Sequence, residues 1–437
     1  MATIGILGCG TVGGGLIRLL AKDREAVTRT AGEEIKIKRV LARTPEKAFA
    51  LGLSSEQVTE SFEDILNDPE IDIVVELMGG VGFAYDCIAA ALRAKKSVVT
   101  GNKDLIELRW DELHELARQN GVALRYEASV GGAIPVIGPI RDTLAGNVYT
   151  RIEGILNGTT NYILSSMEYS DESAGTSYEQ ALETAKKLGY AEADPTNDVE
   201  GLDAARKIAI LARLAFGADV PLESVDTTGI TSLTGDEFYL AKYNLNCTIK
   251  LIACAQKIEN GVCVSVRPTL VPERHPLHGI SGATNAVYLA TDNAGSILLT
   301  GAGAGADATA SSVAGDIIAI VRGAAKGDPA PWHSGCAVAS AKSVPVRRCI
   351  YAFCGGTLEG DMTVRQFISG ILTADKATAA LDGAGIRYES VESTEIGGMS
   401  AVVIITAPLD ESGLDAALAA LGEVSDARKL RSLPFLS

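Results

Sequence analysis

Histidine is scarce in this sequence, with only four in 437 residues. They are His114, His275, His278 and His333, and no pair has the H-x-x-x-H or H-E-x-x-H spacing that helical zinc sites use. The same scarcity of histidine argues against a Ser-His-Asp triad. We therefore expect any proton transfer to depend on lysine, aspartate and glutamate.

Positive charge is also in deficit, because 39 Lys+Arg face 55 Asp+Glu and leave a formal net charge of −16. Such a field repels nucleic-acid backbones and anionic lipid surfaces, so neither is an expected partner. No apolar run approaches about 18 residues, and the first residues read as a strand rather than as a signal peptide. Membrane insertion and export are therefore not expected.

Cysteine pairs are missing too, since the eight cysteines are scattered and form no C-x-x-C motif. A chain of this length needs no disulfide staples, so reduced thiols in the cytoplasm fit best. The overall composition, with 47% apolar and 22% charged residues, is that of an ordinary globular protein. At roughly 100 to 200 residues per domain, the length predicts two or three domains.

The first 133 residues alternate short apolar runs with helical patterns. The predicted strands cover residues 3–9, 35–41, 71–77, 97–100 and 122–130, and the predicted helices cover residues 12–28, 61–66, 84–94 and 105–119. Strands separated by helices predict right-handed crossovers and a parallel sheet that is covered on both faces. The expected fold class is α/β, with a doubly wound, Rossmann-type dinucleotide-binding domain over residues 1–133.

The rest of the chain predicts two further domains. Residues 134–302 are expected to form an α+β domain for substrate binding, catalysis and oligomerisation, with an open mixed sheet. Its predicted strands include residues 262–268, 286–291 and 296–300. Residues 303–325 are expected to pack back on the first domain, and the proline-containing stretch 326–346 reads as a linker.

The C-terminal residues 347–437 have the βαββαβ order of a ferredoxin-like fold. The predicted strands are 349–353, 386–393, 401–406 and 428–431, and the predicted helices are 363–382 and 414–421. This part is expected to be a separate, ACT-like domain.

A glycine-rich turn, Gly8-Cys-Gly10-Thr-Val-Gly13, follows the first strand and opens a helix. A G-x-G-x-x-G dinucleotide fingerprint requires that context, because bare backbone amides must approach a pyrophosphate at a helix N-terminus. The second strand ends in Ala42-Arg43-Thr44 instead of an acidic residue. A guanidinium suits a 2′-phosphate, so NADP is favoured over NAD; the alternative is that Arg43 is a solvated surface charge.

Lys103 lies just past the end of another predicted strand, in Thr100-Gly-Asn-Lys103. Ligands bind at this edge of open α/β sheets, but a solvated lysine explains the position equally well. The segment Glu127-Ala-Ser-Val-Gly-Gly-Ala-Ile-Pro135 runs from a strand into a glycine turn and leaves carbonyl oxygens outside any ladder. Those oxygens could bind a hard monovalent cation or water.

Acidic residues gather between Gly189 and Lys207, ahead of and within a predicted helix. Asp203 and Lys207 are four residues apart and therefore share one helix face. One interpretation is an acidic first turn plus an ordinary ion pair worth about 0.3–0.5 kcal/mol. The other is a carboxylate set that binds an ammonium group beside a lysine acid, and the spacing does not separate the two.

Taken together, these motifs resemble the homoserine dehydrogenase family over nearly the whole chain. The matching segments also include Gly154-Ile-Leu-Asn-Gly-Thr-Thr-Asn161 and Gly301-Ala-Gly-Ala-Gly305, in the family's order. The resemblance implies reversible reduction of L-aspartate 4-semialdehyde to L-homoserine with NADP or NAD, in threonine, methionine and isoleucine biosynthesis. We also expect a homodimer or a homotetramer.

The resemblance assigns roles residue by residue. Lys207 is the implied general acid, and Lys103 beside the nicotinamide is the second proton-transfer group. The implied substrate-binding residues are Glu192, Asp203, Gly189 and Thr160. The implied cofactor-binding residues are Gly8, Gly10, Thr11, Val12, Gly13, Arg43, Thr100, Lys103 and Gly305. A sodium ion is implied at the backbone carbonyls of Glu127, Val130, Gly132 and Ile134.

The C-terminal part resembles an ACT domain, which in many family members senses an amino-acid end product. The loop after its first strand reads Gly355-Gly-Thr-Leu-Glu-Gly-Asp361 instead of the usual Asp-x-Pro-Gly. Threonine feedback therefore does not follow from the resemblance. No aspartate kinase is expected ahead of the fingerprint, which begins at residue 8.

Two other functions fit part of the pattern. A dehydrogenase of another small amino-acid aldehyde or alcohol would use the same fingerprint and lysine pair, since these define hydride chemistry better than substrate length. A non-catalytic NADPH-sensing regulator is the second alternative. Lys103, Glu192, Asp203 and Lys207 together argue against the regulator, because a sensor does not require them.

Overall fold

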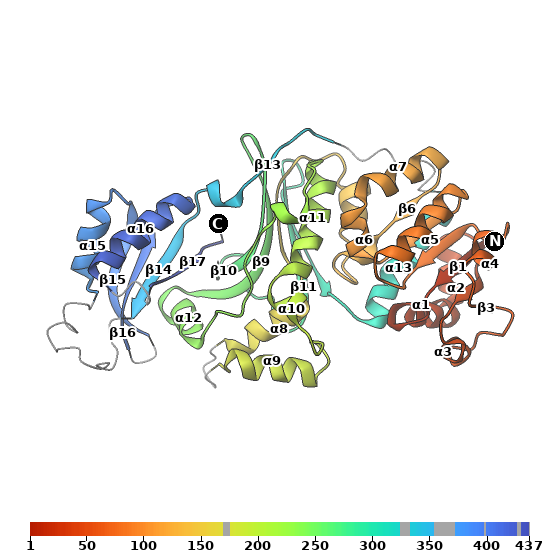
Figure 1. Cartoon of the computed structure of the whole chain (residues 1–437), viewed down its shortest axis with the longest axis horizontal. Coiled ribbons are helices and arrows are strands. Elements are labelled where there is room, and N and C mark those ends of the chain that lie inside the picture. The colour runs from red at the N-terminus through yellow and green to blue at the C-terminus, as the bar shows by residue number, and fades with distance from the viewer. Residues whose placement is uncertain (169–174, 324–332, 354–371, 397–398, 426–429, 437) are drawn as a thin grey trace.

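The computed structural model describes residues 1–168, 175–323, 333–353, 372–396, 399–425 and 430–436. Three parts follow one another along the long axis of the molecule (Figure 1). The N-terminal α/β part lies at one end, a sheet with its helices lies in the middle, and the C-terminal part lies at the other end.

The first sheet contains six parallel strands in the order β3-β2-β1-β4-β5-β6. The strands are β1 (Ala2–Leu7), β2 (Ile35–Leu41), β3 (Val58–Thr59), β4 (Ile73–Glu76), β5 (Ser97–Thr100) and β6 (Leu124–Arg125). The helices are α1 (Thr11–Lys22), α2 (Arg24–Ala31), α3 (Pro45–Phe49), α4 (Glu63–Leu66), α5 (Gly82–Arg93), α6 (Lys103–Leu108) and α7 (Trp110–Asn120). This strand order confirms the doubly wound, Rossmann-type prediction.

Three element predictions in this part were wrong in their extent. The predicted helix 12–28 breaks at Asp23, which leaves helical geometry and separates α1 from α2, and the predicted helix 105–119 breaks at Arg109. The predicted strand 122–130 pairs only as β6. The Glu127 amide donates to Asp316 Oδ2 (2.8 Å) instead of to a neighbouring strand, and the 3-10 turn η1 (Glu127–Ser129) follows.

The central sheet has seven strands, mostly in the order β12-β11-β7-β9-β10-β13, with β8 also paired to β10. The strands are β7 (Tyr149–Ile155), β8 (Asp226–Thr227), β9 (Cys247–Ile258), β10 (Gly261–Pro272), β11 (Thr284–Thr291), β12 (Ser296–Ala302) and β13 (Val338–Ala339). Because β8 and β13 run parallel to β10 while the other pairs are antiparallel, the predicted open mixed sheet is confirmed. The sequence did not predict β7 or β9.

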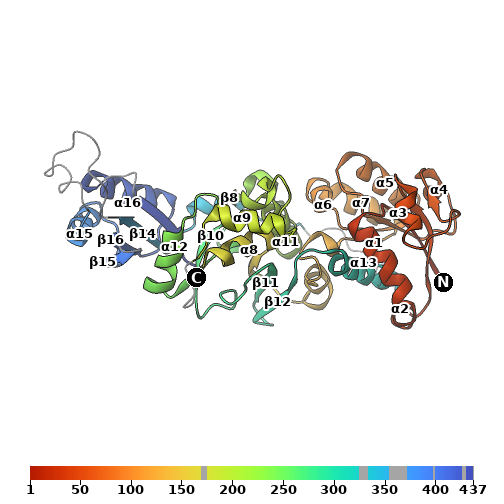
Figure 2. The ribbon, with the colours of Figure 1, turned by 90° about the horizontal axis from the view of Figure 1, so that it is seen from below.

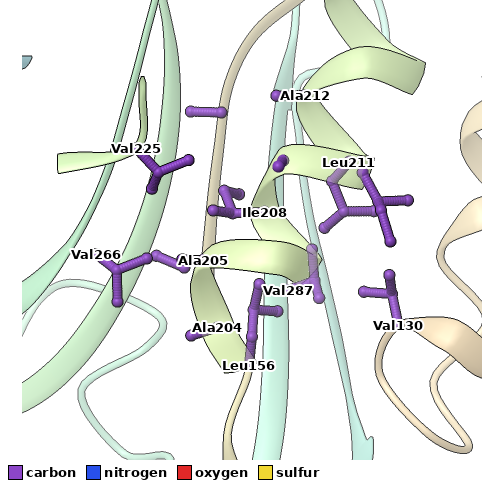
Figure 3. Packing of buried hydrophobic residues seen from close by; sticks show 14 of the residues in the cluster. Val130, Leu156, Ala204, Ala205, Ile208, Leu211, Ala212, Val225, Val266 and Val287 are labelled. Carbon is purple, nitrogen blue, oxygen red and sulfur yellow. The ribbon is translucent and has the colours of Figure 1, made fainter. Parts of the chain in front are cut away.

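Helix α11 (Leu202–Phe216) packs along one face of this sheet (Figure 3). The buried side chains that meet there include Val130, Leu156, Ala204, Ala205, Ile208, Leu211, Ala212, Val225, Val266 and Val287. The other helices of this part are α8 (Gly158–Met167), α9 (Tyr178–Lys187), α10 (Thr196–Val199) and α12 (Gly235–Tyr239), with short turns η2 (Pro139–Thr143), η3 (Leu222–Ser224) and η4 (Leu240–Asn244). The five buried alanines of α11 have small side chains that let the helix axis approach the sheet closely.

Helix α13 (Ala306–Val321) leaves the central sheet after β12 and packs against α1 and α2 (Figure 2). Leu16, Ile17, Val313 and Ile317 belong to the buried cluster that the helices share. Two segments that are nearly 300 residues apart in the sequence therefore lie side by side. The boundaries at residues 133, 302, 326 and 346 stay predictions.

The C-terminal part forms a four-stranded antiparallel sheet in the order β15-β16-β14-β17. Its elements are β14 (Arg348–Phe353), α15 (Ala374–Gly383), β15 (Tyr388–Ile396), β16 (Met399–Thr406), α16 (Glu411–Val424) and β17 (Leu430–Pro434), preceded by η5 (Ala341–Ser343). The predicted βαββαβ order is confirmed over the described residues. The loop at 355–361, residues 363–371 of the predicted helix 363–382 and residues 428–429 of the predicted strand 428–431 lie outside them. Leu436 donates its amide to the Leu270 carbonyl of β10 (2.8 Å), which joins this part to the central sheet.

None of the helices in the described parts of the chain has the length and apolar character needed to cross a bilayer. Seven of the cysteines lie in those parts, and all seven are free thiols.

A stability test follows from the close approach of α1 and α13. A Cβ at Gly15 would lie 2.5 Å from the Ala306 carbonyl oxygen, whereas one at Gly14 would come no closer than 3.5 Å to any neighbour. We expect Gly15→Ala to lower the free energy of unfolding in urea by about 1–3 kcal/mol. The control Gly14→Ala should be neutral or stabilising by up to about 1 kcal/mol, because alanine favours helices. Equal stabilities would contradict the packing.

Candidate active site

The three fingerprint glycines lie in three different environments. Gly8 has φ +98°, and Gly13 lies so close to it that a Cβ would be 2.1 Å from the Gly8 carbonyl oxygen. A Cβ at Gly10 would meet nothing within 4 Å. No side chain in the described residues caps the first turn of α1, which begins with Thr11 and Val12. The turn therefore offers open space beside uncapped helix amides, as a pyrophosphate requires.

Arg43 is exposed and lies two residues past Leu41, the last residue of β2. The Leu41 carbonyl accepts the amide of Gly8 (3.0 Å), so the end of β2 lies directly beside the fingerprint turn. Arg43 is thus at the edge of the sheet where the adenosine ribose of a dinucleotide binds.

A cavity of about 930 Å³ opens where the first sheet, α8, α11 and the start of α13 meet. The predicted site residues that line it are Lys103, Gly132, Gly189, Glu192, Asp203, Lys207 and Gly305. Its lining also includes residues to which the sequence assigned no role, among them Asp104, Ser129, Asn157, Thr159, Tyr190, Asp198 and Arg206. The fold therefore brings the predicted proton-transfer and substrate-binding residues to one hollow.

Asp203 lies at the centre of the charges in this cavity. Its carboxylate is 2.6 Å from Lys207 Nζ through Oδ2 and 3.3 Å from Lys103 Nζ through Oδ1. Asn157 Nδ2 donates to the same Oδ2 (2.9 Å). Burial alone would raise the pKa of Asp203, but the two ammonium groups and these hydrogen bonds outweigh it and hold the pKa at about 2. Asp203 is therefore ionised between two lysines that come from different parts of the chain.

Asn157 was missed in the sequence, although it connects three groups of the site. Its Nδ2 also donates to Asp198 Oδ1 (2.7 Å), and its Oδ1 caps α8 by accepting the Thr160 amide (2.9 Å). Burial raises the pKa of Asp198. Thr160 is buried and bonds to Asn157, and Thr159 lines the cavity in its place, which corrects the expected position of Thr160 by one residue. An asparagine directly before a helix is the signal that could have revealed the cap.

Glu76, at the end of β4, is a second group that sequence reasoning missed. This carboxylate is fully buried and accepts the Thr100 hydroxyl (2.6 Å) and the Met78 amide (2.7 Å). The Thr100 hydroxyl accepts the Asn102 amide (3.0 Å), and Asn102 caps α6, which begins with Lys103. Thr100, expected to bind cofactor, thus lies behind the site, where it fixes the start of α6.

Glu192 is exposed at the cavity, and among the described residues it has no ion-pair partner. Gly189, with φ +79°, forms the turn that leads to it. Asp194 is held differently, because its Oδ1 accepts the Thr196 hydroxyl (2.6 Å) at the start of α10. Glu192 is therefore available to a ligand, whereas Asp194 stabilises a turn.

The segment of the predicted sodium ligands turns sharply at Gly131 and Gly132, which have φ +78° and +60°. The Gly132 carbonyl accepts the Ser312 hydroxyl (2.6 Å), and the Glu127 carbonyl accepts the Val130 amide (3.3 Å). The Glu127 side chain accepts three backbone amides from residues 136–138. In the described residues no group of three or more His, Cys, Asp or Glu side chains could hold a metal ion.

The same region contains two buried carboxyl groups. Burial raises the pKa of Glu127, and burial together with the Glu127 charge raises the pKa of Asp316 to about 8. Asp316 accepts the Glu127 amide, so it attaches α13 to the end of the first sheet.

A dinucleotide-type glycine turn in the N-terminal part, together with a lysine–carboxylate cluster in the cavity, is typical of a nicotinamide-dependent oxidoreductase. Family models described as homoserine dehydrogenase, NAD binding domain, and homoserine dehydrogenase match residues 8–127 and 135–318. The homoserine dehydrogenase of Pseudomonas aeruginosa is 37% identical over 426 residues, which cover 96% of this chain and 94% of that protein. The chain belongs to the homoserine dehydrogenase family and is an oxidoreductase that acts on a CH–OH group.

Solved structures of homoserine dehydrogenases have a similar fold. A homoserine dehydrogenase from Thiobacillus denitrificans has a TM-score of 0.87 and 33% identity and covers 100% of this chain and 98% of its own. A hyperthermophilic archaeal homoserine dehydrogenase in complex with NADPH has a TM-score of 0.61 and 29% identity, covering 73% of this chain and 97% of its own. The similarity to the Thiobacillus protein includes the C-terminal part.

The charge of Asp203 makes stability depend on pH. Its pKa of about 2 lies below the ordinary 3.8, so the ionised form stabilises the folded chain above about pH 4, and this contribution disappears as the pH falls toward 2. We expect the advantage of the wild type over Asp203→Asn in urea unfolding to shrink by about 1 kcal/mol between about pH 5 and about pH 3. A difference that is constant with pH would contradict the pKa.

Proposed function

We propose that this chain catalyses reversible hydride transfer between L-homoserine and L-aspartate 4-semialdehyde, with NADP as the preferred cofactor. The observation that carries the proposal is the Lys103–Asp203–Lys207 cluster in a cavity that is also lined by Gly101, at the end of the first sheet, and by Gly305. Such a cluster can transfer a proton and stabilise negative charge on a carbonyl oxygen. The NADPH complex of the archaeal relative supports a nicotinamide cofactor.

The residues around the fingerprint fit that cofactor, which when bound supplies or accepts the hydride. Gly8, Gly10 and Gly13 would hold the pyrophosphate, because a Cβ at Gly10 would occupy the open space beside the helix amides. Gly305, with φ +130°, directly precedes α13 and lines the cavity that contains Lys103, Asp203 and Lys207. Arg43 would bind a 2′-phosphate through its guanidinium.

Lys207, as an ammonium group, would protonate the carbonyl oxygen during reduction, and in the oxidation direction its neutral amine would accept the hydroxyl proton. Its ammonium group has three protons, and it donates to Asp203 (2.6 Å) and to the Leu156 carbonyl (2.8 Å). Among the described residues no other acceptor binds it, which leaves one proton for a substrate oxygen. Lys103, at the edge of the cofactor sheet, would add positive charge beside the alkoxide.

The amino-acid head of the substrate would lie beside Glu192 in the cavity. Glu192 would accept the substrate ammonium group, since it has no competing cation among the described residues. Gly189 and Thr159 would line the same subsite. A dehydrogenase of another small amino-acid aldehyde or alcohol stays the alternative, and the relative kcat/KM for homoserine, serine and 5-hydroxynorvaline would separate the two.

A sodium ion would bind to the backbone carbonyls of Glu127, Val130, Gly132 and Ile134. The donor set fits, because carbonyl oxygens are hard ligands and each has two lone pairs. The contacts of the Gly132 and Glu127 carbonyls use one lone pair each. The ion would fix the turn between the first sheet and the central part, and exchange of sodium for choline in the assay buffer tests the assignment.

The remaining proposals concern the context of the reaction. The C-terminal part would be an ACT-like regulatory domain, without an implied response to threonine. The chain would act as a homodimer or homotetramer in the cytoplasm, in threonine, methionine and isoleucine biosynthesis.

Lys207→Ala tests the proton-transfer role. We expect kcat to fall by about 10² to 10⁴-fold, because general acid catalysis is typically worth this factor, while NADPH binding by fluorescence titration stays unchanged. Lys187→Ala is the matched control, since Lys187 is exposed and paired with Glu183. A Lys207→Ala variant with more than about a tenth of the wild-type kcat would be incompatible with the role.

Arg43→Asp tests cofactor selection. The wild type should prefer NADP, and the variant should lose roughly 1.5–3 kcal/mol of NADP binding, as for a charged hydrogen bond, with NAD much less affected. Lys36→Asp, at an exposed position on β2, the strand that leads to Arg43, changes the net charge equally and serves as control. If the NADP/NAD ratio of kcat/KM is the same in wild type and Arg43→Asp, Arg43 does not select the cofactor.

A further inference from the structure

Two ion pairs beside the cavity join helix α6 of the N-terminal part to helix α11, and a third, between Glu107 and Arg213 (4.0 Å), joins the same helices farther along. Lys103 and Asp104 are consecutive at the start of α6, and Asp203 and Arg206 lie in the first turns of α11. Lys103 Nζ is 3.3 Å from Asp203 Oδ1, and Arg206 Nε is 3.0 Å from Asp104 Oδ1. The order of charges is reversed between the two helices, so each residue faces its opposite.

The two pairs differ in burial and in what they contact. Asp203 belongs to the proton-transfer cluster, with a side chain only 11% exposed. The Asp104 and Arg206 side chains are 44% and 23% exposed, and no hydrogen bond or ion pair joins them to Lys207 among the described residues. A pair with this exposure adds little to global stability. We therefore expect the Asp104–Arg206 pair to affect the local placement of α6 against α11 and not the free energy of unfolding.

Helix α6 is short, and a few contacts along its length fix its position against the rest of the fold. At its start, Asn102 donates to the Gly80 carbonyl (2.7 Å), which fixes the turn within the first sheet. At its far end, Arg213 of α11 donates to the Glu107 carbonyl (2.5 Å). Near the cavity, the Asp104–Arg206 pair joins the first turn of α6 to α11 directly beside Lys103.

We propose that Asp104 and Arg206 are positioning residues, whose ion pair sets the separation of α6 and α11 so that Lys103 reaches Asp203 beside Lys207. Lys103 has a flexible four-carbon stem and a side chain that is 31% exposed, so its own contact restrains it weakly. The guanidinium–carboxylate pair on the neighbouring residue supplies the missing restraint. This inference rests on the proposed function of the lysine cluster.

A direct substrate contact is the competing role for Arg206, because both residues line the cavity. The two roles predict different effects of Asp104. If Arg206 binds substrate, removing the Asp104 charge leaves the cation in place and KM for homoserine responds only to changes at Arg206. If the pair positions α6, either residue alone disrupts the same contact.

A double-mutant cycle in the full-length protein separates these roles. The variants are Asp104→Asn, Arg206→Gln and the two combined, assayed for homoserine oxidation at saturating NADP. We expect each single variant to lower kcat by about tenfold, with KM for homoserine within about threefold, since small misplacements of catalytic groups are costly. The combined variant should be no slower than either single variant, because all three lack one and the same pair. Asp104→Glu, which keeps the charge, should recover most of kcat.

Arg213→Gln is the structural control, since Arg213 joins the same helices away from the cavity. It should lower the midpoint of thermal unfolding while kcat stays within about twofold, whereas the Asp104 and Arg206 variants should unfold near the wild-type midpoint. If a neutral variant does not fold, Arg206→Lys supplies the test: it keeps the charge but lacks the planar guanidinium, so it should lower kcat less than Arg206→Gln while KM stays within about threefold.

Three results would overturn the inference: unchanged kcat in the single variants, losses that multiply to about a hundredfold in the combined variant, or a KM rise confined to the Arg206 variants. Wild-type protein without homoserine oxidation would instead refute the proposed function.

Discussion

The ionised carboxylate of Asp203 is the feature on which the site depends. A charge that is withdrawn from water destabilises a protein unless cations and hydrogen-bond donors compensate it. Here the compensation comes from Lys207 on the same helix, Lys103 at the start of α6 and Asn157 directly before α8. Because these groups belong to different parts of the chain, satisfying one carboxylate also brings the N-terminal and central parts of the fold together at the cavity.

Glycine makes this assembly sterically possible. A Cβ at Gly132 would lie 2.5 Å from the Gly303 carbonyl, so the turn after the first sheet touches the segment that leads to α13. Gly15 permits a similar approach between α1 and Ala306. The bare backbone that approaches a dinucleotide at Gly10 thus has counterparts at the contacts between the parts of the fold. The chain uses glycine both to admit a ligand and to bring distant segments together.

Features that depend on nearby residues were predictable from the sequence. The strands at 35–41 and 97–100 have the expected bounds, and Asp203 and Lys207 do share a helix face. The contacts of Glu76 and Asn157 could not be derived, because they join residues from separate strands and helices. The strand expected at 122–130 failed for the same reason, since a contact with Asp316 on a distant helix ends it. Local pattern predicts elements, whereas tertiary hydrogen bonds decide which polar groups meet.

The position of α11 connects the hydrophobic core to the chemistry. Ala204 and Ala205 are buried against the central sheet, so larger side chains there would displace the helix. Between these alanines and Ile208 comes Lys207, whose ammonium group is held by Asp203 and the Leu156 carbonyl. Two fixed acceptors define the direction of the remaining N–H group. In the proposed reaction a substrate oxygen would meet that proton from the cavity side, so the packing of small residues under α11 would determine where proton transfer takes place.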